Sequence, residues 1–308
     1  MAIENFIAEL WAAAVQAPFE NELVYAQPSV SNRQYEGQIQ QQGDTVHITT
    51  VGAPTIRAYD KSTDITVEDV EDGEITLTVD QGDYFAFKVN DVDRAQAAGD
   101  FQSSATQQAG YGLKDELDRF VAGLIQPGVQ TANKIGRTVI VNNDGGTPDG
   151  TQTTAWGLLV ALRQKLDKAG VPAAGRYVVV PSEFISAALF DSRFVKVNES
   201  GTDQGLRNGI IARAAGFDIL QSNNAPTVGG TGADKDDLVI AAGIPDALSV
   251  AQQLVKTEAM RMQNRFADMV RGLNVYGGKL TRANGVATAT ARFAPGAGGT
   301  AAPAAPAA

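Results

Sequence analysis

The chain has 308 residues, a formal net charge of −10 at pH 7 and a hydrophobic fraction of 44%, so it can bury a sizeable core and is not a wholly disordered protein. It contains no cysteine and a single histidine, which excludes disulfides, thiolate nucleophiles and cysteine-ligated metal centres. Because the sequence has neither an apolar run approaching a membrane span nor the basic start of a secretory signal, we expect a soluble protein made in a cytoplasm.

The negative charge is concentrated in residues 44–83, which hold ten acidic residues against Arg57 and Lys61. The densest part, residues 60–74, cannot pack against itself, so it is either a solvated loop or a projecting arm that docks onto another subunit by charge complementarity. A calcium site is not favoured, because the regular ligand spacing with a central glycine is missing. The single histidine, His47, lies in a strand-like run and is interpreted as a half-exposed strand side chain.

The N-terminal segment, residues 3–15, repeats its apolar residues at the spacing of an amphipathic helix. The following segment, residues 21–43, is polar, contains Pro28 and follows neither a helical nor a strand period, so we expect an extended strap. The apolar stripe of the helix needs a partner, and the simplest interpretation is a core helix packed under its own domain.

Two short strands are predicted within residues 43–59, on either side of a turn at residues 52–54. Together with the acidic run and a further strand at residues 75–79, they would form an extended β arm. The next strand, residues 84–89, is aromatic and β-branched, as strands favour, and Asp83 is expected in the turn before it.

A long helix is predicted over residues 92–125, because two residues able to cap its first amides, Asn90 and Asp91, precede it. Its second half has a clear apolar face, and Pro127 is expected to stop it. Glycines in its middle each cost up to about 1 kcal/mol relative to alanine, so the sequence is compatible with one bendable helix and with two separate helices.

The second half of the chain alternates helices with short apolar strands. A helix over residues 155–168 has Thr154 at its N-cap and Gly170 after its C-terminus, and a helix that begins at Ser182 follows a buried strand. Strands are predicted at residues 177–180, 216–220, 238–242, 273–280 and 286–292, and a mixed helix or strand run at 247–262. We expect the last two strands to return to the sheet beside the long helix, and the uncharged tail, residues 295–308, to be disordered.

Six motifs follow one another between about residues 6 and 293: ELW, GDTV, YFAFKVNDVDRAQA, GRYVVVPSEF, GFDILQSNN and FADMVRGLNVYGGKL. In content and order they resemble the major capsid proteins of tailed bacteriophages, which share the HK97-like fold. The resemblance implies an α+β capsid tile made of the following parts: an N-terminal arm (1–42), an extended β-hairpin or E-loop (43–90), a peripheral domain with a spine helix and a β-sheet (91–126 and 246–294), a central α/β axial domain (127–245) and a flexible tail (295–308).

The resemblance also implies a structural protein with no catalytic site, cofactor or metal. Copies of it would form hexamers and pentamers and close an icosahedral shell around double-stranded DNA, without sequence-specific contacts because the chain lacks a basic stripe. The expected location is the virion capsid, assembled in the host bacterial cytoplasm without membrane contact. The expected further partners are a separate scaffolding protein, a portal and, optionally, a decoration protein.

The residues expected at contacts between subunits lie in the N-terminal arm and in the β-hairpin. They are Phe6, Leu10, Trp11, Tyr59, Lys61, Asp64, Glu68, Asp69, Glu71 and Asp72. Some relatives join subunits by a lysine to asparagine isopeptide bond, for which Lys61 and Asn274 are a possible pair, the alternative being two ordinary surface residues.

Two other functions stay open from the sequence. An encapsulin-like cellular nanocompartment shell protein would use the same fold to enclose cargo enzymes in place of DNA. An unrelated α/β enzyme would need a pocket with converging carboxylates, and the glycine pairs at residues 145–146 and 229–230 lack the lysine and hydroxyl spacing of a phosphate-binding loop.

Overall fold

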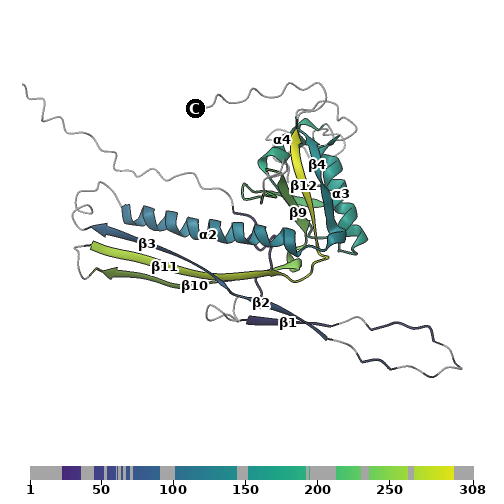
Figure 1. Cartoon of the computed structure of the whole chain (residues 1–308), viewed down its shortest axis with the longest axis horizontal. Helices are drawn as coiled ribbons and strands as arrows, with labels where there is room; N and C mark the ends of the chain where they lie inside the picture. Colours follow the sequence, from purple (N-terminus) through teal and green to yellow (C-terminus); the bar gives the residue numbers. More distant parts are fainter. Residues whose placement is uncertain are drawn as a thin grey trace, which may run out of the picture.

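The fold is that of a computed structural model of the chain (Figure 1). It describes residues 23–35, 45–51, 54–59, 61, 64, 67–69, 72–90, 101–143, 152–191, 194, 213–229, 236–262 and 267–294. The predicted N-terminal helix, the predicted start of the long helix with Asp91, and the C-terminal tail lie outside these residues. Within the described part, no helix is both long and apolar enough to cross a lipid bilayer.

A long helix lies along one face of a three-stranded antiparallel sheet (Figure 1). We call this helix, α2 (Phe101–Gly128), the spine helix. The strands follow the order β10-β11-β3 and are β3 (Gln81–Asn90), β10 (Leu248–Arg261) and β11 (Ala267–Leu280). The spine helix buries Leu117, Val121 and Ile125, each no more than 1% exposed, so the apolar face predicted for its second half is confirmed.

The spine helix is continuous through its two central glycines. Gly110 and Gly112 lie inside α2, so a break into two helices at either of these glycines is wrong. A Cβ atom at either glycine would meet no atom within 4 Å, which means that close packing does not require them. Pro127 does not end the helix, because the last turn runs on to Gly128; a proline near a helix end removes one backbone hydrogen bond without requiring the chain to leave the helix at that residue.

The second sheet stands at the end of the spine helix and is a seven-stranded mixed sheet with the order β5-β4-β12-β9-β6-β8-β7 (Figure 1). Its strands are β4 (Lys134–Asn142), β5 (Gln152–Thr153), β6 (Tyr177–Val180), β7 (Arg213–Ala214), β8 (Phe217–Gln221), β9 (Leu238–Gly243) and β12 (Val286–Ala294). The helices that follow β5 and β6 are α3 (Ala155–Lys168) and α4 (Ser182–Phe190). Two short 3-10 turns connect the parts: Thr131–Asn133 joins the spine helix to β4, and Pro245–Ala247 joins β9 to β10 of the three-stranded sheet.

Both faces of the seven-stranded sheet are covered. On β6, Val178 and Val180 pack with α3 and α4, whereas Tyr177 and Val179 pack with the spine helix and residues 23–35. Strand side chains alternate between the two faces, so a strand that is buried at every position, as β6 is, needs a layer on each side. The continuous apolar run of β6 therefore reflects its place between α3 and α4 on one face and the spine helix with residues 23–35 on the other.

Local predictions for the second half of the chain are largely confirmed. The Thr154 hydroxyl accepts a hydrogen bond from the Gly157 amide at 3.2 Å, and Gly170 has a left-handed φ of 72° after the end of α3. The mixed run before residue 262 is a strand, β10. The prediction that residues 286–292 return to the sheet beside the spine helix is wrong, because β12 pairs with β4 and β9. An apolar strand pattern carries no information on which of two sheets receives it.

The extended arm is an antiparallel ribbon of β1 (Thr45–Val51) and β2 (Asp72–Thr78), which projects from the three-stranded sheet (Figure 1). The predicted pairing within residues 43–59 is wrong, because residues 54–59 are not a strand. Val46 lies opposite Leu77 in the ribbon and Ile48 opposite Ile75, and such cross-strand apolar pairs favour this register.

The predicted turn at Asp83 is also wrong. Asp83 lies inside β3, opposite Asn274 of β11, and its carboxylate accepts a hydrogen bond from the Tyr276 hydroxyl. The chain has no turn here: only Val79 and Asp80 separate β2 from β3, and the chain passes through them from the ribbon into the three-stranded sheet. β2 and β3 therefore belong to different sheets and are not a hairpin.

The described part of the predicted strap, residues 23–35, is folded into turns that pack on the core. Val30 and Ser31 both donate backbone hydrogen bonds to the Gln27 carbonyl, so this part is not extended as predicted. Tyr25 and Val30 are fully buried against the spine helix. Apolar residues within an otherwise polar segment dock it onto the body of the protein.

Candidate assembly surfaces

The base of the arm is held firmly on the three-stranded sheet. Leu77 and Val79 are fully buried in a small cluster with Val275 of β11. A Cβ atom at Gly277 would overlap the Thr78 carbonyl, so the sheet needs a glycine where the arm crosses it. The position of the arm relative to the body is set by these close contacts.

The far end of the arm exposes large apolar side chains. Ile56 is 97% exposed, Tyr59 77% and Val67 88%. Glu68 accepts a hydrogen bond from the Thr55 backbone amide and lies 3.4 Å from the Arg57 guanidinium, which connects the two sides of the loop. Apolar groups held out into solvent favour burial against another surface.

The structure brings together several of the residues predicted at contacts between subunits. Tyr59, Lys61, Asp64, Glu68 and Asp69 share the loop at the end of the arm and are exposed.

The remaining members of that set are Phe6, Leu10, Trp11 and Glu71, which lie outside the described residues, and Asp72, the first residue of β2. A role of the whole set between subunits stays a prediction.

His47 lies on β1, as predicted, and its ring bonds the Glu74 carboxylate across the ribbon. Its side chain is 62% exposed, so it is more open to solvent than a half-exposed strand residue. Among the described residues, no group of three or more histidine or acidic side chains is arranged to hold a metal ion.

Asn274 is not the surface residue that the isopeptide hypothesis considers. It is fully buried on β11, and its side-chain oxygen accepts a hydrogen bond from Gln252 at 3.1 Å. Lys61, in contrast, is exposed on the arm. Within one chain, the exposed Lys61 amine therefore has no solvent-exposed Asn274 side chain to meet, because Asn274 is buried in the sheet.

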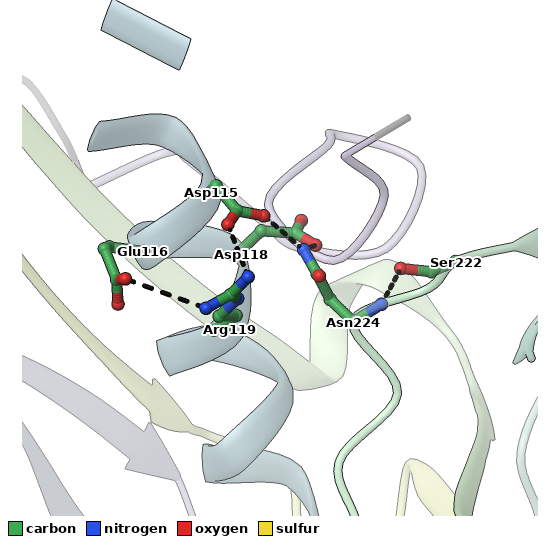
Figure 2. A network of polar contacts seen from close by, with 6 residues as sticks. All are labelled: Asp115, Glu116, Asp118, Arg119, Ser222 and Asn224. Carbon is green, nitrogen blue, oxygen red and sulfur yellow. Dashed lines mark hydrogen bonds and ion pairs between the residues drawn. The ribbon is translucent and has the colours of Figure 1, made fainter. Parts of the chain in front are cut away.

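A polar cluster joins the spine helix to the seven-stranded sheet (Figure 2). The Asn224 side-chain amide donates to Asp115 at 2.8 Å and to Asp118 at 3.1 Å, two carboxylates almost one helical turn apart. The second oxygen of Asp118 accepts a hydrogen bond from the Ala26 backbone amide at 3.0 Å. We call these four residues the spine junction. They link the spine helix, the turn after β8 and the N-terminal segment at one point.

Asn224 is itself held in place by the turn after β8 (Figure 2). Its backbone amide donates to the Ser222 hydroxyl at 3.1 Å, and the Ser222 amide donates to the Val180 carbonyl of β6. Ser222 is only 2% exposed. These bonds fix the position of Asn224 relative to the ends of the neighbouring strands β6 and β8.

The spine junction carries an unusual charge balance. Asp118 is fully buried; burial raises its pKa, hydrogen bonds from Ala26, Asn224 and Tyr25 counteract this, and the nearby charge of Asp115 raises it further. The Arg119 guanidinium lies 2.8 Å from the Asp115 carboxylate and 3.8 Å from that of Glu116, so it forms its ion pairs with the two more exposed carboxylates. The buried one is stabilised chiefly by uncharged donors.

The sequence contained a signal for this junction that we did not interpret. Asp118 precedes Ala122 and Ile125 by four and seven residues, so it lies within the apolar stripe of the spine helix. A carboxylate in such a stripe predicts a buried polar contact. The identity of its partners, Asn224 and the Ala26 backbone, depends on the tertiary fold.

The phage capsid protein family model matches residues 73–298 of the chain. A solved structure from Mycobacterium phage Che8 is 30% identical, with a TM-score of 0.72, and the match covers 94% of this chain and 98% of that one. No curated protein sequence matches significantly.

Two further solved structures share the fold at lower identity. The capsid structure of cyanophage P-SCSP1u is 17% identical with a TM-score of 0.74, covering 96% of this chain and 95% of that one. A chain from the mature capsid of bacteriophage PhiM1 is 17% identical with a TM-score of 0.70, covering 94% and 93% respectively. The architecture, an HK97-like mixed α and β fold, is thus the same as in these capsids.

Proposed function

The chain belongs to the phage capsid protein family, and from this premise we propose that its copies form hexamers and pentamers that close an icosahedral shell around double-stranded DNA. It is a structural shell protein of the virion capsid, and capsids are built of many copies. The family and the capsid structures do not favour a cellular nanocompartment or an unrelated enzyme.

The observation that carries the proposal is the exposed apolar end of the projecting arm. Ile56, Tyr59 and Val67 together would bury several hundred Å² if a neighbouring copy covered them, on the scale of a functional surface patch. Each contact can be modest, because a closed shell repeats it around every ring.

In this proposal the two sheets have different roles. The seven-stranded sheet with α3 and α4 is the axial domain, which meets its copies around the rings. The spine helix and the three-stranded sheet are the peripheral domain, and the arm extends from it to a neighbouring subunit. The N-terminal arm is proposed for residues 1–42, of which residues 23–35 are docked on the core of their own subunit. The division differs from the predicted boundaries in giving β12 to the axial domain, in keeping with its pairing to β4 and β9.

The proposal includes the partners of the shell. Assembly would take place in the host bacterial cytoplasm, on a separate scaffolding protein and around a portal, with a decoration protein as an optional addition. The acidic chain would enclose the packaged DNA without base-specific contacts. Weak repulsion between the acidic wall and the DNA would let the DNA slide along the wall as it is packaged.

The test is electron microscopy of the purified protein and of two triple variants. Replacing Ile56, Tyr59 and Val67 by serine removes the exposed apolar surface, and we expect folded subunits that form no closed shells. The matched control is Ile56→Leu, Tyr59→Phe and Val67→Ile, which keeps the apolar surface and should keep the shells. Wild-type particles from the serine variant would refute the role of the arm, and a wild-type protein that stays monomeric under all conditions would refute the proposed function.

A further inference from the structure

The spine helix and the seven-stranded sheet meet through two kinds of contact. The first is an apolar cluster that includes Val121 and Ile125 of the helix and Val179 of β6. The second is the spine junction, in which Asn224 donates to both Asp115 and Asp118. The two contacts differ in how strongly they depend on orientation.

Apolar burial is roughly proportional to the area removed from water and is not directional, so an apolar cluster tolerates small rotations. Hydrogen bonds weaken steeply when donor and acceptor are misaligned. The two hydrogens of one Asn224 amide nitrogen serve two carboxylates that are three residues apart on the helix. A rotation of the sheet relative to the helix therefore breaks at least one of these bonds.

Breaking either bond is costly at this position. Asp118 is fully buried and Asp115 has a side chain only 14% exposed, so water has little access to replace the lost donor. Arg119, one residue beyond Asp118 on the helix, forms its ion pair with Asp115 at 2.8 Å. The Ala26 amide occupies the other oxygen of Asp118, so the N-terminal segment is fixed to the same point.

We propose that Asn224 is a positioning residue for assembly, which fixes the orientation of the seven-stranded sheet relative to the spine helix and thereby the curvature of the shell. This inference rests on the proposed function. In a shell of identical copies, the angle inside each subunit is repeated in every ring, so a small change of that angle changes the particle diameter.

The experiment compares particle diameter by electron microscopy with the thermal unfolding midpoint of dissociated subunits. Asn224→Gln keeps two donor hydrogens but moves them by one methylene, and Asn224→Ala removes them. We expect both variants to fold and to give particles of altered or mixed diameter, with the midpoint of Asn224→Gln within a few degrees of wild type. The matched control is Asn284→Gln, at an exposed turn residue, which should give wild-type particles.

The possible outcomes separate the two ideas. Wild-type diameters from both Asn224 variants would overturn the inference and leave the shell function intact. A subunit with Asn224→Gln that does not fold would also overturn it, because the junction would then act on folding and not on orientation. If the wild-type chain forms no shells at all, the proposed function fails first.

Discussion

The base of the arm offers a measurable separation between local and global stability. A two-stranded ribbon is at best marginally stable by itself, so the packing of Leu77 and Val79 on Val275 is what orders β1 and β2. Leu77 is fully buried, and replacing a buried leucine by alanine costs about 2–5 kcal/mol. At 1.4 kcal/mol per tenfold change, the lower end of this range already corresponds to about a 30-fold loss of local protection.

Native-state hydrogen exchange of the dissociated subunit measures this effect. For Leu77→Ala we expect the amides of β2 to exchange faster by a factor of about 30 or more, while the amides of β6 in the buried sheet keep their wild-type rates. Ile56→Ala is the control, because its side chain is 97% exposed and contributes no burial. Equal acceleration in β2 and β6 would refute the argument, since the arm and the body would then unfold together.

Three further predictions concern other parts of the subunit. Gly277→Ala should displace the arm, because its methyl group overlaps the Thr78 carbonyl, and a crystal structure with the arm unmoved would contradict this. Arg292→Ala removes the guanidinium that binds Asp237 at 2.7 and 3.0 Å; since Asp237 is 2% exposed, chemical denaturation should report a loss of about 3 kcal/mol. Burial raises the pKa of Asp118 in the folded state, so the native protein takes up a proton at a higher pH than the unfolded chain does. The free energy of unfolding of the wild type, measured relative to that of Asp118→Asn, should therefore rise as the pH falls from neutral through the raised pKa. A difference between the two proteins that is constant with pH would contradict this prediction.

Local signals predicted individual elements well. The Thr154 cap, the glycine after α3 and the uniformly apolar β6 each involve residues close in sequence, and each formed as expected. The apolar face of the spine helix was also predictable, because the 3.6-residue spacing of its apolar residues can be recognised within one continuous segment of sequence. The motif order was enough to indicate the capsid fold.

Pairing between distant segments was less predictable. β1 pairs with β2 across a long loop and not with the predicted strand within residues 54–59, and β12 enters the seven-stranded sheet. An alternating pattern shows that a strand has a buried face but not which strand lies beside it, since several edges can satisfy the same backbone hydrogen bonds.

The amino-acid sequence by itself determined the class of fold, most of the helices and strands, the concentration of acid in the arm and the lack of any cysteine for thiol chemistry. Only the tertiary structure decided which sheet each strand joins, where the arm is anchored and which groups meet Asp118. The physical reason is range: capping and periodicity act within a few residues, whereas the spine junction joins side chains more than 100 positions apart, which only the complete fold brings within hydrogen-bonding distance.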